Sequence, residues 1–75
     1  MIECLLYRNS TAQRRLFYRV EIAMNLFSEV SVMREWGLAG GRPKAVVQCF
    51  SNLREASRAA DRHRNRAERR GYLRA

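Results

Sequence analysis

WGLAGGR, at residues 36–42, contains the only tryptophan of the chain and three of its four glycines, and it ends one residue before the only proline. Glycine at this density predicts a hairpin connection that is wider than a two-residue turn. A large aromatic ring beside glycines is suited to receive something flat and anionic, and a strongly basic segment follows later in the chain. The alternative is that Trp36 folds back over the hairpin as a small hydrophobic lid.

Three segments before this stretch have the composition of strands. The clearest is residues 16–23, which alternate with the period of two that a strand requires. One face would carry Leu16, Tyr18, Val20 and Ile22, and the other Phe17, Arg19, Glu21 and Ala23. Residues 2–8 suit an edge strand, and residues 29–36 suit a third strand on which Arg34 and Trp36 share a face with Val30 and Val32.

Turn signals separate these segments. Residues 9–11 (Asn-Ser-Thr) predict a turn after the first strand, and residues 12–15 suit either a helical turn or a loop. Asn25 and Ser28 supply turn chemistry between the second and third strands.

After the glycines, residues 44–50 are rich in β-formers and predict a fourth strand. Asn52 followed by Glu55 has the spacing of a helix N-terminus, and residues 53–70 contain no glycine, proline or β-branched residue. Gly71 suits the C-terminal cap, after which Tyr72 and Leu73 turn back in a few extended residues. A narrow stripe of small residues would pack on the sheet, with His63 at its boundary: Leu53, Ala56, Ala60 and Ala67.

Strands first and one helix last predict a single α+β domain over residues 1–75. We expect an antiparallel sheet of about four strands with one long C-terminal helix packed on one face. A chain of this length buries only about 60% of its unfolded surface, which favours a thin core over a deep catalytic pocket.

The net charge of +8 is the strongest global feature, and fourteen of the fifteen basic residues are arginine. The planar guanidinium group suits phosphate, and an arginine excess in a small domain is typical of nucleic-acid binders. An acidic protein partner or an anionic membrane surface remains an alternative. Part of the helix charge is expected to pair locally, for example Arg58 with Asp61.

The two cysteines, Cys4 and Cys49, have no metal-ligand spacing, and the chain has no signal-peptide pattern and no apolar run long enough to span a membrane. We therefore expect a cytoplasmic protein, nucleoid-associated if it binds DNA, with both thiols reduced and packed as small hydrophobes. The sequence offers no nucleophile with a neighbouring base and no carboxylate pair. We expect neither an enzyme nor a cofactor or metal site.

Several short motifs occur in an order that resembles the WGR domain family. They are Phe-Tyr at residues 17–18, Trp-Gly-x-x-Gly at 36–40, Phe-Ser at 50–51 and Gly-Tyr at 71–72. The resemblance covers roughly residues 13–73. The family includes the nucleic-acid-binding module of poly(ADP-ribose) polymerases and small stand-alone bacterial proteins. It implies a curved antiparallel sheet crossed by a helix, without catalytic activity in this domain.

The resemblance further implies that Trp36 contacts a sugar or base at a DNA strand end and that Gly37 permits close backbone approach. The third position of the family tripeptide is arginine, whereas this chain has Leu38. We infer from the residues themselves that Arg34, two positions before Trp36, or Arg42, just beyond the glycines, replaces the missing cation.

These observations predict a stand-alone nucleic-acid-binding domain that binds mainly phosphates, while Trp36 stacks at an end, a nick or a single-stranded region. DNA is the expected partner, although nothing in the residues distinguishes it from RNA. The candidate contact residues are Trp36, Gly37, Arg34, Arg42, Lys44, Arg58, Arg62 and Arg66. The alternative is a protein-interaction or dimerisation module of the same fold, which uses an apolar patch near Trp36 and Leu38 and has lost DNA binding.

Overall fold

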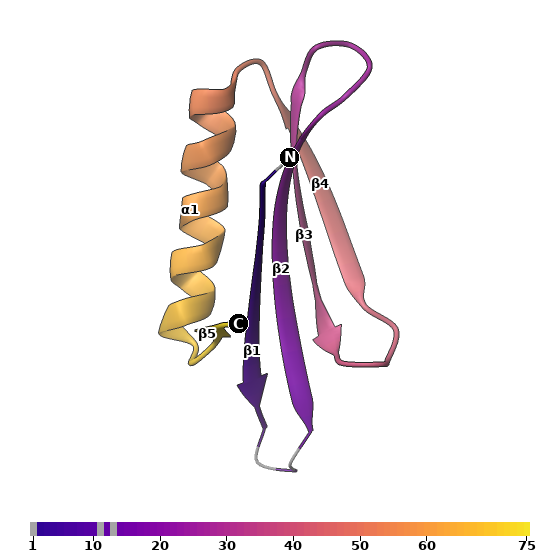
Figure 1. Ribbon diagram of the computed structural model, residues 1–75, viewed down its shortest axis with the longest axis vertical. Helices are drawn as coiled ribbons and strands as arrows, with labels where there is room; N and C mark the ends of the chain where they lie inside the picture. The colour runs from indigo at the N-terminus through magenta and orange to yellow at the C-terminus, as the bar shows by residue number, and fades with distance from the viewer. Residues whose placement is uncertain (1, 11, 13) are drawn as a thin grey trace.

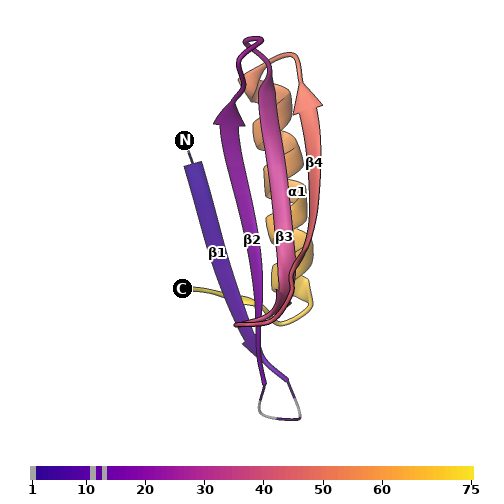
Figure 2. The ribbon, with the colours of Figure 1, turned by 90° about the vertical axis from the view of Figure 1, so that its right-hand side faces the viewer.

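A five-stranded antiparallel sheet carries one helix on one face, which confirms the α+β prediction (Figure 1). The computed structural model describes residues 2–10, 12 and 14–75. The strand order across the sheet is β4-β3-β2-β1-β5. After a turn of 90°, α1 lies behind the sheet, and the face of the sheet toward the viewer is uncovered (Figure 2). The elements are β1 (Ile2–Asn9), β2 (Arg15–Met24), β3 (Val30–Leu38), β4 (Lys44–Phe50), α1 (Leu53–Arg69) and β5 (Leu73–Arg74).

The alternation predicted for β2 decides which side chains form the core. Even-numbered residues of the strands point toward α1 and odd-numbered residues toward the uncovered face, since directly paired residues share a face. Leu6 and Val32 are the largest fully buried side chains. The rest of the core comes from the same sheet face, from the helix and from the C-terminal segment: Tyr18, Val20, Ile22, Val30, Ala56, Ala59, Ala60, Ala67 and Tyr72.

The helix ends as its sequence predicts. The Asn52 side chain accepts a hydrogen bond from the backbone N–H of Glu55 at 2.9 Å, which satisfies a free donor of the first turn. At the other end Gly71 has φ 94°, a conformation that glycine adopts without strain. Arg8 of β1 adds a contact that the sequence did not reveal, because its Nη1 donates to the carbonyl of Arg70 at 2.7 Å. A guanidinium group at the helix C-terminus also offsets the helix dipole there.

The predicted packing stripe is wrong at one position. Leu53 is 53% exposed, whereas Ala59, which was not assigned to the stripe, is fully buried. Leu53 is the first helical residue, near the end of the sheet, and therefore has little to pack against. Alanine at the central contact positions lets the helix approach the sheet closely, and this is why Ala59 can be fully buried.

Three strand predictions need adjustment. The third strand continues through Gly37 to Leu38, so the connection to β4 is shorter than expected. The extended C-terminal residues form a fifth strand, β5, which pairs with Leu6 and Tyr7 of β1 and protects part of that edge. Asn9 belongs to β1, Ala12 lies in a turn, and β2 begins at Arg15. The parts of these turn predictions that fall on residues 11 and 13 lie outside the described residues.

The loop between β2 and β3 uses its asparagine as expected. The Asn25 side-chain oxygen accepts hydrogen bonds from the backbone N–H groups of Phe27 and Glu29, at 2.9 and 3.0 Å. Ser28 completes the loop with a positive φ of 61°.

The two cysteines lie on opposite faces of the sheet, and both are free. Cys4 is partly buried on the helix side, whereas Cys49 is exposed, so the prediction that both thiols are packed is wrong for Cys49. Position 49 of β4 points to the uncovered face, where no element lies over it. Within the part of the chain that the structure describes, no helix is long and apolar enough to cross a membrane.

Candidate nucleic-acid interface

Trp36 and Arg34 lie on the helix side of β3, as the alternation predicts, at the end of the sheet where α1 terminates (Figure 1). Trp36 is half-buried, and its ring stacks on the ring of Tyr18, its direct partner on β2, with 6.2 Å between centroids and 21° between planes. The indole therefore serves partly as a lid on the core, and it also retains exposed surface. The contact and lid interpretations of Trp36 are compatible with each other.

Three aromatic rings form a row beneath the last turns of α1. Tyr18 stacks on Trp36 and meets Tyr72 edge-on, with 5.8 Å between the centroids of the two tyrosine rings. An arginine stands at each end of this aromatic row (Trp36, Tyr18 and Tyr72). The Cζ of Arg34 is 5.5 Å from the Trp36 ring centroid, and the Cζ of Arg8 is 5.1 Å from that of Tyr72. Both distances are within the range of cation–π attraction.

The aromatic row forms the floor of a small pocket of about 140 Å³ between β3 and the C-terminal end of α1. Arg34 enters it from the sheet, and Arg66 and Arg70 enter it from the helix. We call this the Trp36 pocket; its lining consists of Tyr18, Arg34, Trp36, Arg66, Ala67, Arg70 and Tyr72. The sequence prediction missed Arg70 and Tyr72. The helix-ending signal of Gly71 could have located them, because both residues adjoin it.

The arginines of α1 approach this pocket along one flank of the helix. Arg58, Arg62 and Arg66 are spaced four residues apart, and each step of four turns about 40° around the helix. The row therefore winds from the solvent side at Arg58 to the pocket at Arg66.

Two of the three acidic residues of α1, Asp61 and Glu68, lie on its other flank. Arg64 is 3.5 Å from Asp61 and 3.9 Å from Glu68, and Asp61 and Arg64 border a cleft with residues of β1 and β2. The predicted pairing of Arg58 with Asp61 is therefore wrong, because Arg64 takes that carboxylate. No carboxylate among the described residues lies within ion-pair distance of the Arg58, Arg62, Arg66 row or of Arg34.

The pKa of His63 indicates a positive electrostatic potential beside the Trp36 pocket. Its pKa is lowered from the ordinary value, first by burial and then by the charges of Arg34, Arg66 and Arg62. The Nδ1 of His63 and the Nε of Arg34 are both buried, and neither has a hydrogen-bond partner within the described residues. His63 lies at the boundary of helix and sheet, as predicted. An anion at this position would offset the repulsion between the protonated imidazole and the neighbouring arginines.

The glycine hairpin holds the remaining predicted residues. Gly37 has φ 154°, and a Cβ built there would lie 3.2 Å from the Cα of Pro43, so the arms of the hairpin approach closely at this residue. A turn is closed by a 2.9 Å hydrogen bond from the N–H of Gly41 to the carbonyl of Leu38. Leu38 follows Trp36 on the helix side of β3 and is 37% exposed.

The predicted contact residues thus fall into three groups. Arg34, Trp36 and Arg66 come together in the pocket, and Lys44 pairs directly with Trp36 from the exposed strand β4. Arg58 and Arg62 continue the positive surface along the helix. The third group, Gly37 and Arg42, belongs to the hairpin, where Arg42 is exposed and outside the pocket lining.

Comparison with known proteins identifies the family. A family model described as the WGR domain matches residues 3–75, essentially the whole chain, so the chain belongs to the WGR domain family. The WGR domain is a nucleic-acid-binding module in proteins related to poly(ADP-ribose) polymerases. Neither the curated proteins nor the solved structures include a significant match to the chain.

Proposed function

We propose that this WGR domain binds DNA, mainly through phosphates, with Trp36 contacting a nucleotide at an end, a nick or a single-stranded region. The Trp36 pocket carries the proposal: three arginines converge on an aromatic row, and no described carboxylate pairs with any of them. Such a site combines the two interactions that bind exposed nucleotides, namely charge-assisted contact to phosphate and packing against an aromatic ring.

The size of the pocket supports contact with part of a nucleotide. Enclosed small-molecule sites generally have volumes of about 300 Å³ or more, whereas this pocket has about 140 Å³. One face of the Trp36 ring is already occupied by Tyr18. A sugar or phosphate at a strand end fits such a site, and its recognition is independent of base sequence because no base edge is read.

The positive surface beyond the pocket supplies a path for the rest of the nucleic acid. Arg58 and Arg62 extend the positive surface from the pocket along α1. Lys44 of β4, the direct partner of Trp36, extends it across the sheet. Arg34, Arg66 and Arg70 also compensate in part for the missing arginine of the family tripeptide at Leu38. In a bacterial cell such a protein would act in the cytoplasm, at the nucleoid.

The alternative, a protein interface through Trp36 and Leu38, has weaker support. Trp36 packs on Tyr18 and the core, so the apolar surface at this end is limited to Leu38 and the exposed part of the indole. Contiguous patches at protein interfaces are generally several hundred Å² in area.

A binding comparison tests the proposal. Fluorescence anisotropy with labelled single-stranded, nicked and blunt duplex oligonucleotides, each at two salt concentrations, measures affinity and its salt dependence. We expect tighter binding to the forms with strand ends than to a closed circular duplex competitor. Trp36→Phe, which preserves packing on Tyr18, should lower that preference. Arg54→Gln, at an exposed residue about 200° around α1 from buried Ala56, is a control outside the pocket and should keep the wild-type preference. The absence of binding to every form at low salt would refute the proposal.

A further inference from the structure

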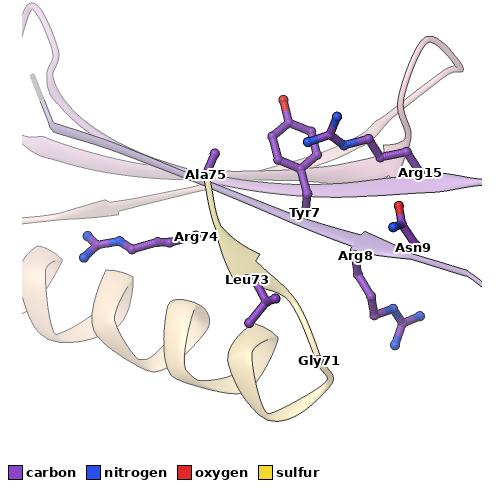
Figure 3. Close-up of a pocket in the computed structure, with 8 residues that line it drawn as sticks. All are labelled: Tyr7, Arg8, Asn9, Arg15, Gly71, Leu73, Arg74 and Ala75. Carbon is purple, nitrogen blue, oxygen red and sulfur yellow. The ribbon is translucent and has the colours of Figure 1, made fainter.

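A second positively charged hollow lies at the β1 and β5 edge of the same end of the sheet, where side chains from both faces line it. It has a volume of about 580 Å³ and is formed where β5 leaves the edge of β1 (Figure 3). We call it the edge hollow; its lining consists of Tyr7, Arg8, Asn9, Arg15, Gly71, Leu73, Arg74 and Ala75. None of these residues lines the Trp36 pocket, although the Arg8 guanidinium group lies over the ring of Tyr72, which does.

Tyr7 and Arg15 form the central feature of the edge hollow. Both side chains point away from α1, and the Arg15 Cζ lies 3.8 Å from the centroid of the Tyr7 ring (Figure 3). Phe17 pairs directly with Tyr7 on the neighbouring strand, so its ring belongs to the same uncovered face. The partner of Phe17 on β3 is Gly37, which contributes no side chain over it.

The edge hollow carries positive charge. Arg15 is exposed and has no ion-pair partner among the described residues. Arg8 turns toward the helix side and donates to a backbone carbonyl (Figure 3), and no side-chain carboxylate of the described residues pairs with it. Arg74 contributes its stem, while its Nε lies 3.4 Å from the Cys4 sulfur. No side-chain carboxylate is part of the lining.

We propose that the edge hollow and Phe17 bind an unpaired strand of nucleic acid, with bases stacking on the Arg15–Tyr7 pair and on Phe17. Tyr7 and Phe17 are half-buried and lie on the uncovered face. Aromatic rings on the open face of an antiparallel sheet and arginine planes are both surfaces on which unpaired bases stack, and arginine also contacts the backbone phosphates. The inference rests on the proposed function, since it assigns a second subsite to the same nucleic acid.

The rest of the uncovered face limits where the strand can run. Arg19 is surrounded by Glu3, Glu21 and Glu35 at 3.0, 3.9 and 3.3 Å, so the middle of this face carries more negative than positive charge. A phosphate backbone is repelled there. The strand therefore lies along the row of Tyr7 and Phe17, at the end of the sheet that also bears the Trp36 pocket on its other face.

This arrangement fits a duplex end with an overhang. The Trp36 and Tyr18 pair and the adjacent Phe17 and Gly37 pair lie next to one another along the strands and point to opposite faces. A terminal nucleotide in the Trp36 pocket and an unpaired continuation in the edge hollow would therefore use two faces of the same sheet end.

The test uses two probes, a labelled oligo(dT) single strand and a labelled blunt duplex. Loss of a stacking ring generally weakens single-strand binding by about 5- to 150-fold, and we expect Tyr7→Ala to weaken oligo(dT) binding within that range. Arg15→Gln should weaken it as well and reduce the log–log salt slope by about 0.7. Blunt-duplex affinity and the Trp36 fluorescence response to that duplex should stay at wild-type values. Tyr7→Phe, which keeps the ring, and Arg54→Gln are the controls.

Every outcome is informative. Unchanged oligo(dT) affinity in Arg15→Gln, whose side chain is exposed and outside the hydrophobic core, overturns the inference even if Tyr7→Ala fails to fold. Equal weakening on both probes also overturns it, because the edge hollow would then not be a separate site. If wild-type protein binds blunt duplex but not oligo(dT), the inference fails while the proposed function stands. If it binds neither probe, the proposed function fails with it.

Discussion

Replacing Arg66 by Gln should reduce the salt dependence of DNA binding by a defined amount. Arg66 is the helix residue at which the Arg58, Arg62, Arg66 row reaches the Trp36 pocket, and no described carboxylate pairs with it. Its charge is therefore available to a phosphate. Glutamine retains much of the side-chain length and helix propensity, so the change acts mainly on charge.

The magnitude follows from the number of free cations at the site. On duplex DNA each neutralised phosphate contributes about −0.9 to the slope of log affinity against log salt. If Arg34, Arg62, Arg66 and Arg70 neutralise one phosphate each, the wild-type slope is about −3.6, and Arg66→Gln reduces it to about −2.7. Between about 50 and 200 mM salt, wild-type affinity then falls about 150-fold and variant affinity only about 40-fold.

The assay is an anisotropy titration of a labelled blunt duplex at four or more salt concentrations in that range. Arg54→Gln removes the same charge from the first turn of the same helix, on the side away from the sheet, and should keep the wild-type slope. Equal slopes for wild type and Arg66→Gln would refute the assignment of Arg66 to a phosphate. Equal reductions in both variants would show that binding depends on net charge and not on this pocket.

Three further predictions concern the helix cap, the histidine and the departure from the family motif. Asn52→Ala should lower the free energy of unfolding by about 1 kcal/mol in urea titrations, because it removes the hydrogen bond to the Glu55 N–H; an unchanged midpoint would contradict this. Because the pKa of His63 is lower in the folded chain, the unfolded chain binds more protons below pH 6.5. The free energy of unfolding should therefore fall as the pH drops from 6.5 to the pKa of His63 in the folded chain. His63→Gln should remove this part of the pH dependence. Added DNA should raise the pKa of His63 in an NMR titration, and no change would place the phosphates elsewhere. Leu38→Arg should strengthen DNA binding; weakened self-association with negligible DNA binding would favour the protein-interface alternative.

The sequence predicts the fold well where a local rule determines the structure. The alternation in residues 16–23 identified the buried face of β2, and Asn52 and Gly71 marked the ends of the helix through their own backbone chemistry. These signals act over a few residues, so they are readable without knowledge of the partners. Arg34 and Trp36 were placed on a common face by the same argument.

Features that depend on distant contacts were not predictable in this way. The pairing of β5 with β1 joins residues more than sixty positions apart, and it decides that Tyr72 is buried. Cys49 is exposed because it lies on the face of β4 that α1 does not cover, and the sequence alone does not show which face that is. The choice of Arg64 over Arg58 as partner of Asp61 depends on side-chain directions that spacing alone leaves open.

The candidate site was predictable in part for the same reason. Residue types and charge indicated a nucleic-acid interface, and the strand faces joined Trp36 to Arg34. Only the packed structure brings Arg66, Arg70 and Tyr72 to the same pocket. It also places Asp61 and Glu68 beside Arg64, on the flank of α1 away from the arginine row.

The most direct test of the central claim is an NMR titration that follows the indole N–H of Trp36, the only tryptophan of the chain. We predict that a short blunt duplex at low salt shifts this signal progressively and saturably, together with the side chains of Arg34 and Arg66, and that raising the salt reverses the shift. A duplex that binds while the indole signal stays unchanged would contradict the account, because the nucleic acid would then contact the protein away from the Trp36 pocket.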